Sequence, residues 1–111
     1  MANFLPLKKD SEFRHIYKVG FSKATKHLVV YCIKNDDNNR LPRIGFVASK
    51  KIGNAVVRNR YRRLMKEALK TVNEFSGYDL IVLARPRIVK ADFKTICKDV
   101  NFLLKRQNIF R

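Results

Sequence analysis

The sequence predicts an α+β fold, in which helices pack over a single β-sheet. Three β-rich apolar segments are visible, at residues 27–33, 43–49 and 78–84, with a briefer candidate strand at 21–25. Three other segments have apolar residues at helical spacing, at 11–19, 55–74 and 92–105. The expected order of elements is therefore α-β-β-β-α-β-α, arranged as a two-layer sandwich.

The first helix is expected to follow a short basic segment, residues 1–9, which we predict to be loosely ordered. Asp10 or Ser11 is suited to cap the helix at its N-terminus, and Glu12 is favourable in the first turn. Gly20 can end the helix in the left-handed conformation. The apolar residues at helical spacing in between are Phe13, Ile16 and Tyr17.

The strand at 27–33 is followed by the polar segment 34–40, whose Asn and Asp content indicates a turn. Because the chain then returns along 43–49, we expect these two strands to pair as an antiparallel hairpin. Pro42 fits the beginning or the edge of a strand.

The second half of the chain begins with a basic turn, after which Asn54 is the best N-cap candidate for the long helix. Ser76 and Gly77 stop this helix, and the nearly continuous apolar run at 78–84 predicts a buried strand. Residues 85–87 (Arg-Pro-Arg) break regular structure, and Asp92 is a candidate cap for the last helix. Residues 109–110 either extend that helix or fray.

The composition favours a polyanionic partner. The chain has 111 residues, enough for one domain, and 25 Lys and Arg against nine acids give a formal charge of +16. A membrane surface is the weaker alternative, because no apolar run of about 18 residues and no signal-peptide core are present. We expect a single domain over 1–111, with 1–9 and 106–111 as loosely ordered tails.

The cysteine and histidine residues do not indicate a metal site or a catalytic site. Cys32 and Cys97 lie far apart in apolar patterns without metal-ligand spacing, so we expect buried thiols in a reducing cytosol, with a disulfide or redox role as the alternative. His15 and His27 stand alone, and we expect both at partly exposed positions beside the core.

The charge is concentrated in one stretch. From Arg40 to Lys70 there are ten Lys or Arg and a single acid, Glu67. On a helical wheel the apolar residues fall on one side, namely Val57, Tyr61, Leu64, Met65, Ala68, Val72 and Phe75, and the polar ones on the other, namely Arg58, Asn59, Arg62, Arg63, Lys66 and Lys70. A charged helix face is often simply solvated. A merely soluble face would mix signs, however, which favours polyanion binding here.

The same stretch contains a sequence motif that resembles one of a known family. Residues 49–55 (Ser-Lys-Lys-Ile-Gly-Asn-Ala), followed by 57–60 (Val-Arg-Asn-Arg), resemble the signature of the protein subunit of bacterial ribonuclease P, and the similarity extends from about Phe4 to Lys105. The resemblance implies a four-stranded sheet with a left-handed βαβ crossover through the basic helix. Pattern alone favours the right-handed connection.

The resemblance also implies a function. In this family the RNA subunit hydrolyses precursor tRNA to remove its 5′ leader, and the protein assists binding of the substrate and of Mg²⁺, held mainly by RNA and substrate. The acids of this chain are scattered, without a carboxylate cluster for two-metal chemistry, so we expect no catalytic residue here. The implied partners are ribonuclease P RNA and precursor tRNA in the cytoplasm, without membrane or DNA.

The resemblance assigns two surfaces. Contacts to the catalytic RNA are expected from the turn and the basic helix: Lys50, Lys51, Asn54, Arg58, Asn59, Arg60, Arg62, Arg63 and Lys66. Arg60 lies off the main basic sector of the wheel, so a structural role stays open for it. Lys90 is a further candidate contact.

The second surface is aromatic. Phe13, Tyr17 and Tyr31 match positions that line the cleft for the 5′ leader in the family, and aromatic rings stack on unpaired bases with little sequence preference. The alternative is that Phe13 and Tyr17 are ordinary core residues of the first helix. For the whole chain, a structural RNA-binding protein of ribosomal type remains the main rival, and a sequence-specific DNA-binding protein is disfavoured because no helix-turn-helix spacing is present.

Overall fold

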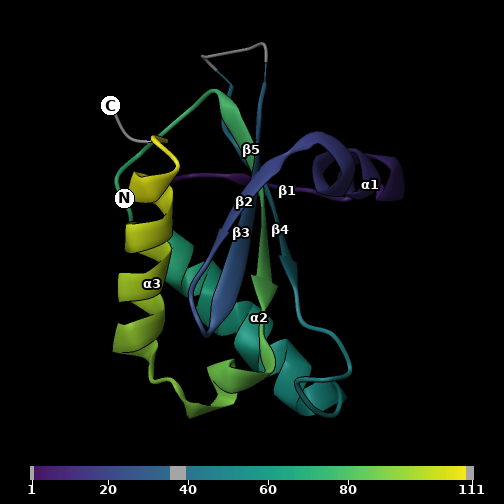
Figure 1. The fold of residues 1–111 in the computed structure, drawn as a ribbon, viewed down its shortest axis with the longest axis vertical. Helices are drawn as coiled ribbons and strands as arrows, with labels where there is room; N and C mark the ends of the chain where they lie inside the picture. The colour runs from purple at the N-terminus through teal and green to yellow at the C-terminus, as the bar shows by residue number, and fades with distance from the viewer. Residues whose placement is uncertain (1, 36–39, 110–111) are drawn as a thin grey trace.

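The computed structural model describes residues 2–35 and 40–109, which form one mixed sheet with helices on both faces (Figure 1). This confirms the α+β class. The elements in chain order are β1 (Leu5–Pro6), α1 (Asp10–Val19), β2 (Phe21–Ala24), β3 (Leu28–Lys34), β4 (Arg43–Val47), α2 (Ala55–Lys70), β5 (Tyr78–Ala84), the 3-10 helix η1 (Pro86–Lys90) and α3 (Phe93–Arg106).

The strand order is β1-β4-β5-β3-β2, with β5 at the centre. Because β5 pairs antiparallel with β3 and parallel with β4, these two strands are not neighbours, and the predicted hairpin between them is wrong. The apolar run of β5 explains its position, since a strand that is apolar on both sides needs cover on both faces. The turn residues 36–39 lie outside the described residues.

The sheet has five strands, where the resemblance implied four. The additional strand comes from the segment expected to be loosely ordered: Leu5 and Pro6 pair in parallel with Arg43 and Ile44. Leu7 is buried next to this strand. Apolar burial and backbone pairing together fix this segment to the edge of the sheet, where Pro6, which lacks an N–H, is tolerated.

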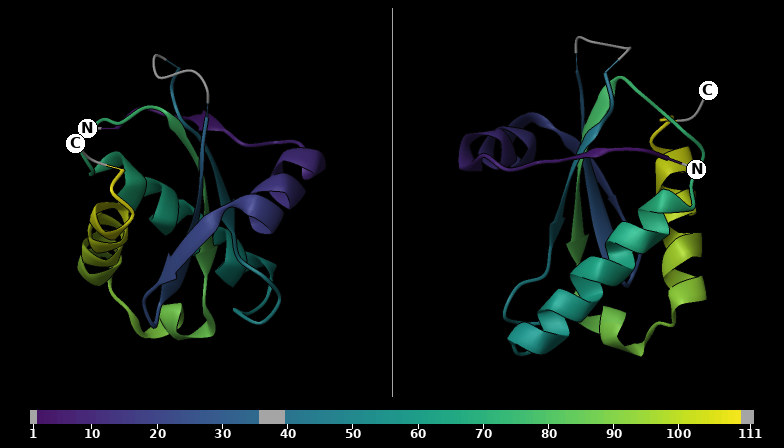
Figure 2. Two further views of the ribbon diagram at one scale, coloured as in Figure 1. Left: turned by 45° about the horizontal axis from the view of Figure 1, so that its top comes forward. Right: turned by 180° about the vertical axis from the view of Figure 1, so that it is seen from behind.

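β4 and β5 run in the same direction and are joined through α2. Seen from the side of α2 (Figure 2, right), β4 lies to the left of β5 while both strands run downwards, so the crossover is left-handed. This hand is rare for βαβ units. It agrees with the hand that the resemblance implied.

Helices cover both faces of the sheet, which corrects the expected two-layer arrangement (Figure 2). α2 and α3 pack over the main core, which includes Val30 and Val82. α1 lies on the opposite face over a smaller core built from Leu7, Ile16 and Ile81. Successive residues of a strand point to opposite faces. The central strands β3 and β5 therefore supply apolar side chains to both cores, and the apolar side of α1 is drawn to the second one.

The predicted caps of α2 and α3 are confirmed. The side chain of Asn54 accepts a hydrogen bond from the backbone N–H of Val57 at 3.0 Å, and that of Asp92 accepts one from Thr95 at 2.8 Å. The hydrogen bonds from Thr95 also lower the pKa of Asp92. α2 ends at Lys70, a few residues before the predicted end.

Both predicted ends of α1 need correction. The N-cap is Lys9, whose side chain makes no capping hydrogen bond, instead of Asp10 or Ser11. Gly20 follows the helix in an extended conformation, with φ −73°, and not in the left-handed one. Glycine fits here for another reason: a Cβ atom would lie 2.5 Å from the carbonyl oxygen of Ile16. The chain therefore passes too close to its own last turn for a side chain.

Candidate nucleic-acid interface

α2 presents its basic residues to the outside because its other side is fixed in the core. The buried residues of α2 are Tyr61, Met65, Ala68 and Leu69. Of the eight basic residues of the turn and the helix, we refer to seven as the cationic face, namely Lys50, Lys51, Arg58, Arg60, Arg62, Arg63 and Lys66. The eighth, Lys70, forms an ion pair with Glu67. Within the cationic face, Arg58 and Arg62 are half-buried, and the other five are exposed. Asn54 and Asn59, both exposed, lie among them.

The charge of the cationic face is not compensated within the described part of the chain. The ion pairs there are His27–Asp99, Arg40–Asp79, Arg43–Glu12 and Lys70–Glu67, and none involves the cationic face. Arg62 donates a hydrogen bond to the side-chain oxygen of Asn59, but this acceptor is neutral and leaves the charge in place. Seven like charges on one surface repel each other, so a polyanion bound there relieves the repulsion.

Arg58 and Arg60 differ in their surroundings. The Nε atom of Arg58 is buried and has no hydrogen-bond partner among the described residues. A buried donor without an acceptor is destabilising by about 1–3 kcal/mol. Arg60 is exposed and makes no ion pair or hydrogen bond within the described residues, which gives the structural role left open for it no support.

Phe13, Tyr17 and Tyr31 gather on the face of the sheet that carries α1, and we refer to them as the aromatic surface. The rings of Tyr17 and Tyr31 meet edge to face, with centroids 4.9 Å apart and planes at 81°. Tyr17 is 40% exposed, whereas Phe13 and Tyr31 are half-buried against the smaller core. Burial, and then the neighbouring Tyr31, raise the pKa of Tyr17, so its hydroxyl stays protonated at neutral pH.

Phe13 owes its position to Gly45. A Cβ atom on Gly45 would lie 2.5 Å from Cζ of Phe13, so the ring lies directly on the backbone of β4. The alternative that these rings are ordinary core residues therefore holds in part for Phe13, which packs against the smaller core. It holds least for Tyr17, which is the most exposed of the three.

The two surfaces lie on opposite faces of the sheet, because α1 covers one face and α2 the other (Figure 2). Lys90, the further candidate contact, is exposed at the end of η1. η1 lies next to α2, since the hydroxyl of Tyr61 donates to the carbonyl of Val89 at 3.4 Å. The residues predicted for RNA contact thus fall on one side of the molecule and the aromatic ones on the other.

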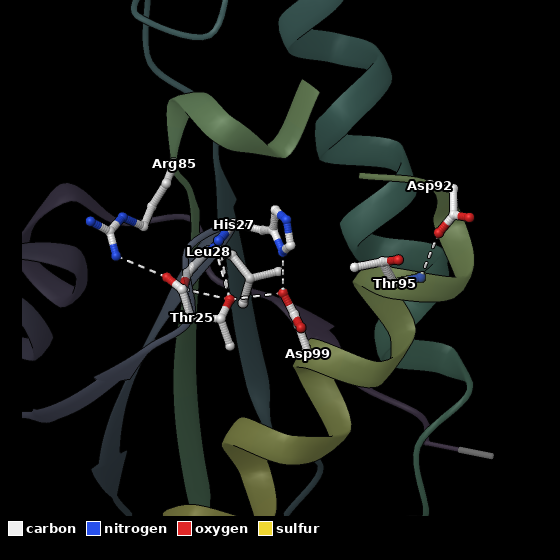
Figure 3. A network of polar contacts seen from close by, with 7 residues as sticks. All are labelled: Thr25, His27, Leu28, Arg85, Asp92, Thr95 and Asp99. Atoms are coloured by element: carbon white, nitrogen blue, oxygen red, sulfur yellow. Dashed lines mark hydrogen bonds and ion pairs between the residues drawn. The ribbon is translucent and has the colours of Figure 1, made fainter. Parts of the chain in front are cut away.

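A polar network that the sequence did not indicate ties the β2–β3 turn to α3 (Figure 3). Nδ1 of His27 lies 2.7 Å from Oδ2 of Asp99, and the hydroxyl of Thr25 donates to the same oxygen at 2.8 Å. The guanidinium of Arg85 donates to the backbone carbonyl of Thr25 at 2.8 Å. No local signal could have revealed this network, since its members lie up to 74 positions apart.

The cysteines are both free. Cys32 is fully buried, as expected, and burial, followed by the nearby Asp79, raises the pKa of its thiol to about 12. Cys97 is only half-buried. Within the described residues no three His, Cys, Asp or Glu side chains gather where they could hold a metal ion. None of the described helices is long and apolar enough to span a membrane.

Fold and surfaces together define a small, strongly basic α+β protein of the nucleic-acid-binding class. Comparison of the chain with known proteins identifies the family within this class. The family model "Ribonuclease P" matches residues 1–108. The ribonuclease P protein component of Clostridioides difficile is 46% identical over 106 residues, covering 93% of this chain and 91% of that protein. The chain therefore belongs to the ribonuclease P protein family.

Solved structures agree. The RNase P protein of Staphylococcus aureus superposes with a TM-score of 0.84 at 32% identity, covering 98% of this chain and 100% of that one. The protein of Thermotoga maritima gives a TM-score of 0.77 at 28% identity, covering 91% and 96%. As a protein component of ribonuclease P, the chain is part of the RNA–protein endoribonuclease of tRNA 5′ maturation. This decides against both the ribosomal and the DNA-binding alternatives.

Proposed function

We propose that the cationic face binds the catalytic RNA subunit of ribonuclease P. The observation that carries this proposal is the set of seven cations without an acidic partner among the described residues. Backbone phosphates and 2′-hydroxyl groups are the groups that such a surface recognises, so binding depends on the shape of the RNA more than on its sequence. Asn54 and Asn59 add polar contacts among these cations, and Lys90 adds a further cation from η1.

In the same proposal, the aromatic surface binds the single-stranded 5′ leader of precursor tRNA. Tyr17 is exposed enough to stack on an unpaired base, and Tyr31 supports its ring from the side. Phe13 backs the surface from the core side. Stacking contributes about 1–3 kcal/mol per base and tolerates any base, which suits substrates whose leaders differ in sequence.

Hydrolysis is assigned to the RNA subunit, with Mg²⁺ bound mainly by the RNA and the substrate. In support of this assignment, no three His, Cys, Asp or Glu side chains among the described residues gather where they could hold a metal ion. Its own contribution is positive charge and stacking. We also propose a cytoplasmic location without membrane or DNA partners, which suits the two free cysteines.

Reconstitution tests this function. The purified protein is added to the matching ribonuclease P RNA at low Mg²⁺, with one precursor tRNA carrying leaders of graded length. We expect little cleavage by the protein alone, restored cleavage in the complex, and affinity that increases with leader length until the aromatic surface is filled. Absence of restored cleavage overturns the proposal, and affinity independent of leader length overturns its second half.

A further inference from the structure

A basic hollow lies at the end of the sheet, apart from both surfaces above. It is a depression of about 410 Å³ lined by Lys26, Arg85, Pro86 and Arg87. Lys26 belongs to the β2–β3 turn, whereas the other three residues follow β5 and begin η1. Two segments distant in sequence thus bring three cations to one concave place.

The hollow is held in shape from behind. The backbone N–H of Arg85 donates to the carbonyl of His27 at 2.9 Å, and its guanidinium donates to the carbonyl of Thr25 at 2.8 Å (Figure 3). The β2–β3 turn is closed by the backbone hydrogen bond from Thr25 to Leu28 at 2.9 Å and is tied to α3 through Asp99. The Arg85 side chain is therefore oriented before any ligand arrives, which lowers the entropy lost on binding.

The charge of the hollow is available to a ligand. Lys26 and Arg87 make no ion pair within the described residues, and the one acceptor of Arg85 there is a neutral carbonyl. The nearest acid in the network, Asp99, is engaged by Thr25 and His27. An arginine fork flanked by two further cations matches the oxygen atoms of a phosphate group.

We propose that the basic hollow binds a backbone phosphate of RNA, as a contact separate from the cationic face. This inference rests on the proposed function only in taking RNA as the partner. The β2–β3 turn and η1, whose residues line the hollow, lie at the same end of the molecule as the N-terminal part of α2 (Figure 1). An RNA strand seated on α2 can therefore continue past η1 towards the β2–β3 turn. The phosphate belongs either to the ribonuclease P RNA or to the precursor tRNA.

The test uses the reconstituted holoenzyme and the variants Lys26→Ala, Arg87→Ala and their combination. Lys105→Ala, which removes an exposed cation on α3, is the matched control. Arg85 is left intact because its side chain also braces the turn. Affinity is measured over a salt series in two arms: protein binding to ribonuclease P RNA, and holoenzyme binding to precursor tRNA. In one arm the double variant is expected to lower the slope of log K against log salt by about 0.7–0.9 for the lost phosphate contact.

The arm that changes identifies the RNA that supplies the phosphate. Slopes equal to those of the Lys105→Ala control in both arms overturn the inference. Unfolding curves of each variant establish that the fold is intact, and Lys26→Gln with Arg87→Gln provides a second neutral pair should the alanine variants be destabilised. If the wild-type complex cleaves precursor tRNA while the double variant has the same salt slopes as the control, the phosphate site in the basic hollow is refuted and the proposed function stands.

Discussion

The ring of Tyr17 meets that of Tyr31 edge to face at a centroid distance of 4.9 Å, joining α1 to β3 on the face of the sheet opposite α2. This contact covers only part of the Tyr17 side chain, which remains 40% exposed. Edge-to-face pairs are worth about 0.5–1.5 kcal/mol beyond their buried area, so Tyr31 holds the orientation of an exposed ring. Such a fixed ring loses little entropy when a base stacks on it.

Replacing Tyr17 by alanine should therefore weaken the part of precursor tRNA binding that depends on the leader. We expect a loss of about 1–3 kcal/mol, roughly 5- to 150-fold in Kd, for substrates with a leader and little change for mature tRNA. Tyr17→Phe keeps the ring and should stay within about twofold of the wild type. Holoenzyme affinities for matched tRNAs with and without the leader measure this. An equal loss for both RNAs would count against leader stacking.

Removal of Arg62 or Lys66 should weaken binding of ribonuclease P RNA and make it less dependent on salt. Each lost phosphate contact lowers the slope of log K against log salt by up to about one unit. Titrations between low and physiological salt give the slope, with Lys105→Ala as the control. A slope unchanged by both substitutions would mean that these side chains face solvent in the complex.

Asn54 offers a way to separate stability from RNA binding. Its cap on Val57 is lost in Asn54→Ala, for which we expect about 0.5–2 kcal/mol lower free energy of unfolding. Asn54→Asp keeps the cap and favours the helix dipole, so the stability should be retained. The new negative charge beside Lys50 and Lys51 should nevertheless weaken RNA binding. Urea unfolding and RNA titration are measured on both variants. Full affinity of Asn54→Asp would remove this turn from the interface.

A side chain at Gly45 should displace the ring of Phe13. A Cβ atom there would lie 2.5 Å from the Phe13 ring, and we expect Gly45→Ala to be destabilised by about 1–3 kcal/mol. Combining it with Phe13→Leu removes the clash. The double variant should therefore lose less free energy of unfolding than the two single variants lose together. Urea unfolding of the four members of this cycle provides the test. Strict additivity would contradict the contact.

Cys32 gives the stability a dependence on alkaline pH. The folded state raises its pKa from 9.0 to about 12, so its stabilising effect is complete below pH 9 and is lost as the pH rises towards 12. In that window the free energy of unfolding should fall by about 1.4 kcal/mol per pH unit more in the wild type than in Cys32→Val. Unfolding curves at successive pH values measure the difference. Parallel curves for the two proteins would contradict it.

Several parts of this fold follow from local sequence alone. Asn54 and Asp92 were identifiable as caps because capping depends on a side chain and the N–H groups a few residues further along. The core side and the cationic face of α2 follow from helical periodicity in the same way. The signature at 49–60 was sufficient to indicate the family. The helical periodicity, the caps of α2 and α3 and the charge distribution depend on residues close together in the chain, which a single sequence shows directly.

Other features depend on residues that meet only in the folded chain. The strands β3 and β4 were predictable from the sequence, but the position of β5 between them was not. Strand pairing depends on which neighbours bury the central strand on both faces, and these neighbours are distant in sequence. The burial of α1 against the second face, the pairing of Leu5 with Arg43, and the basic hollow are long-range in the same sense. The amino-acid sequence thus determined that this protein would be a basic α+β member of its family. The tertiary structure decided which cations and rings share a surface, because those distances are set by the packing of the sheet and not by spacing along the chain.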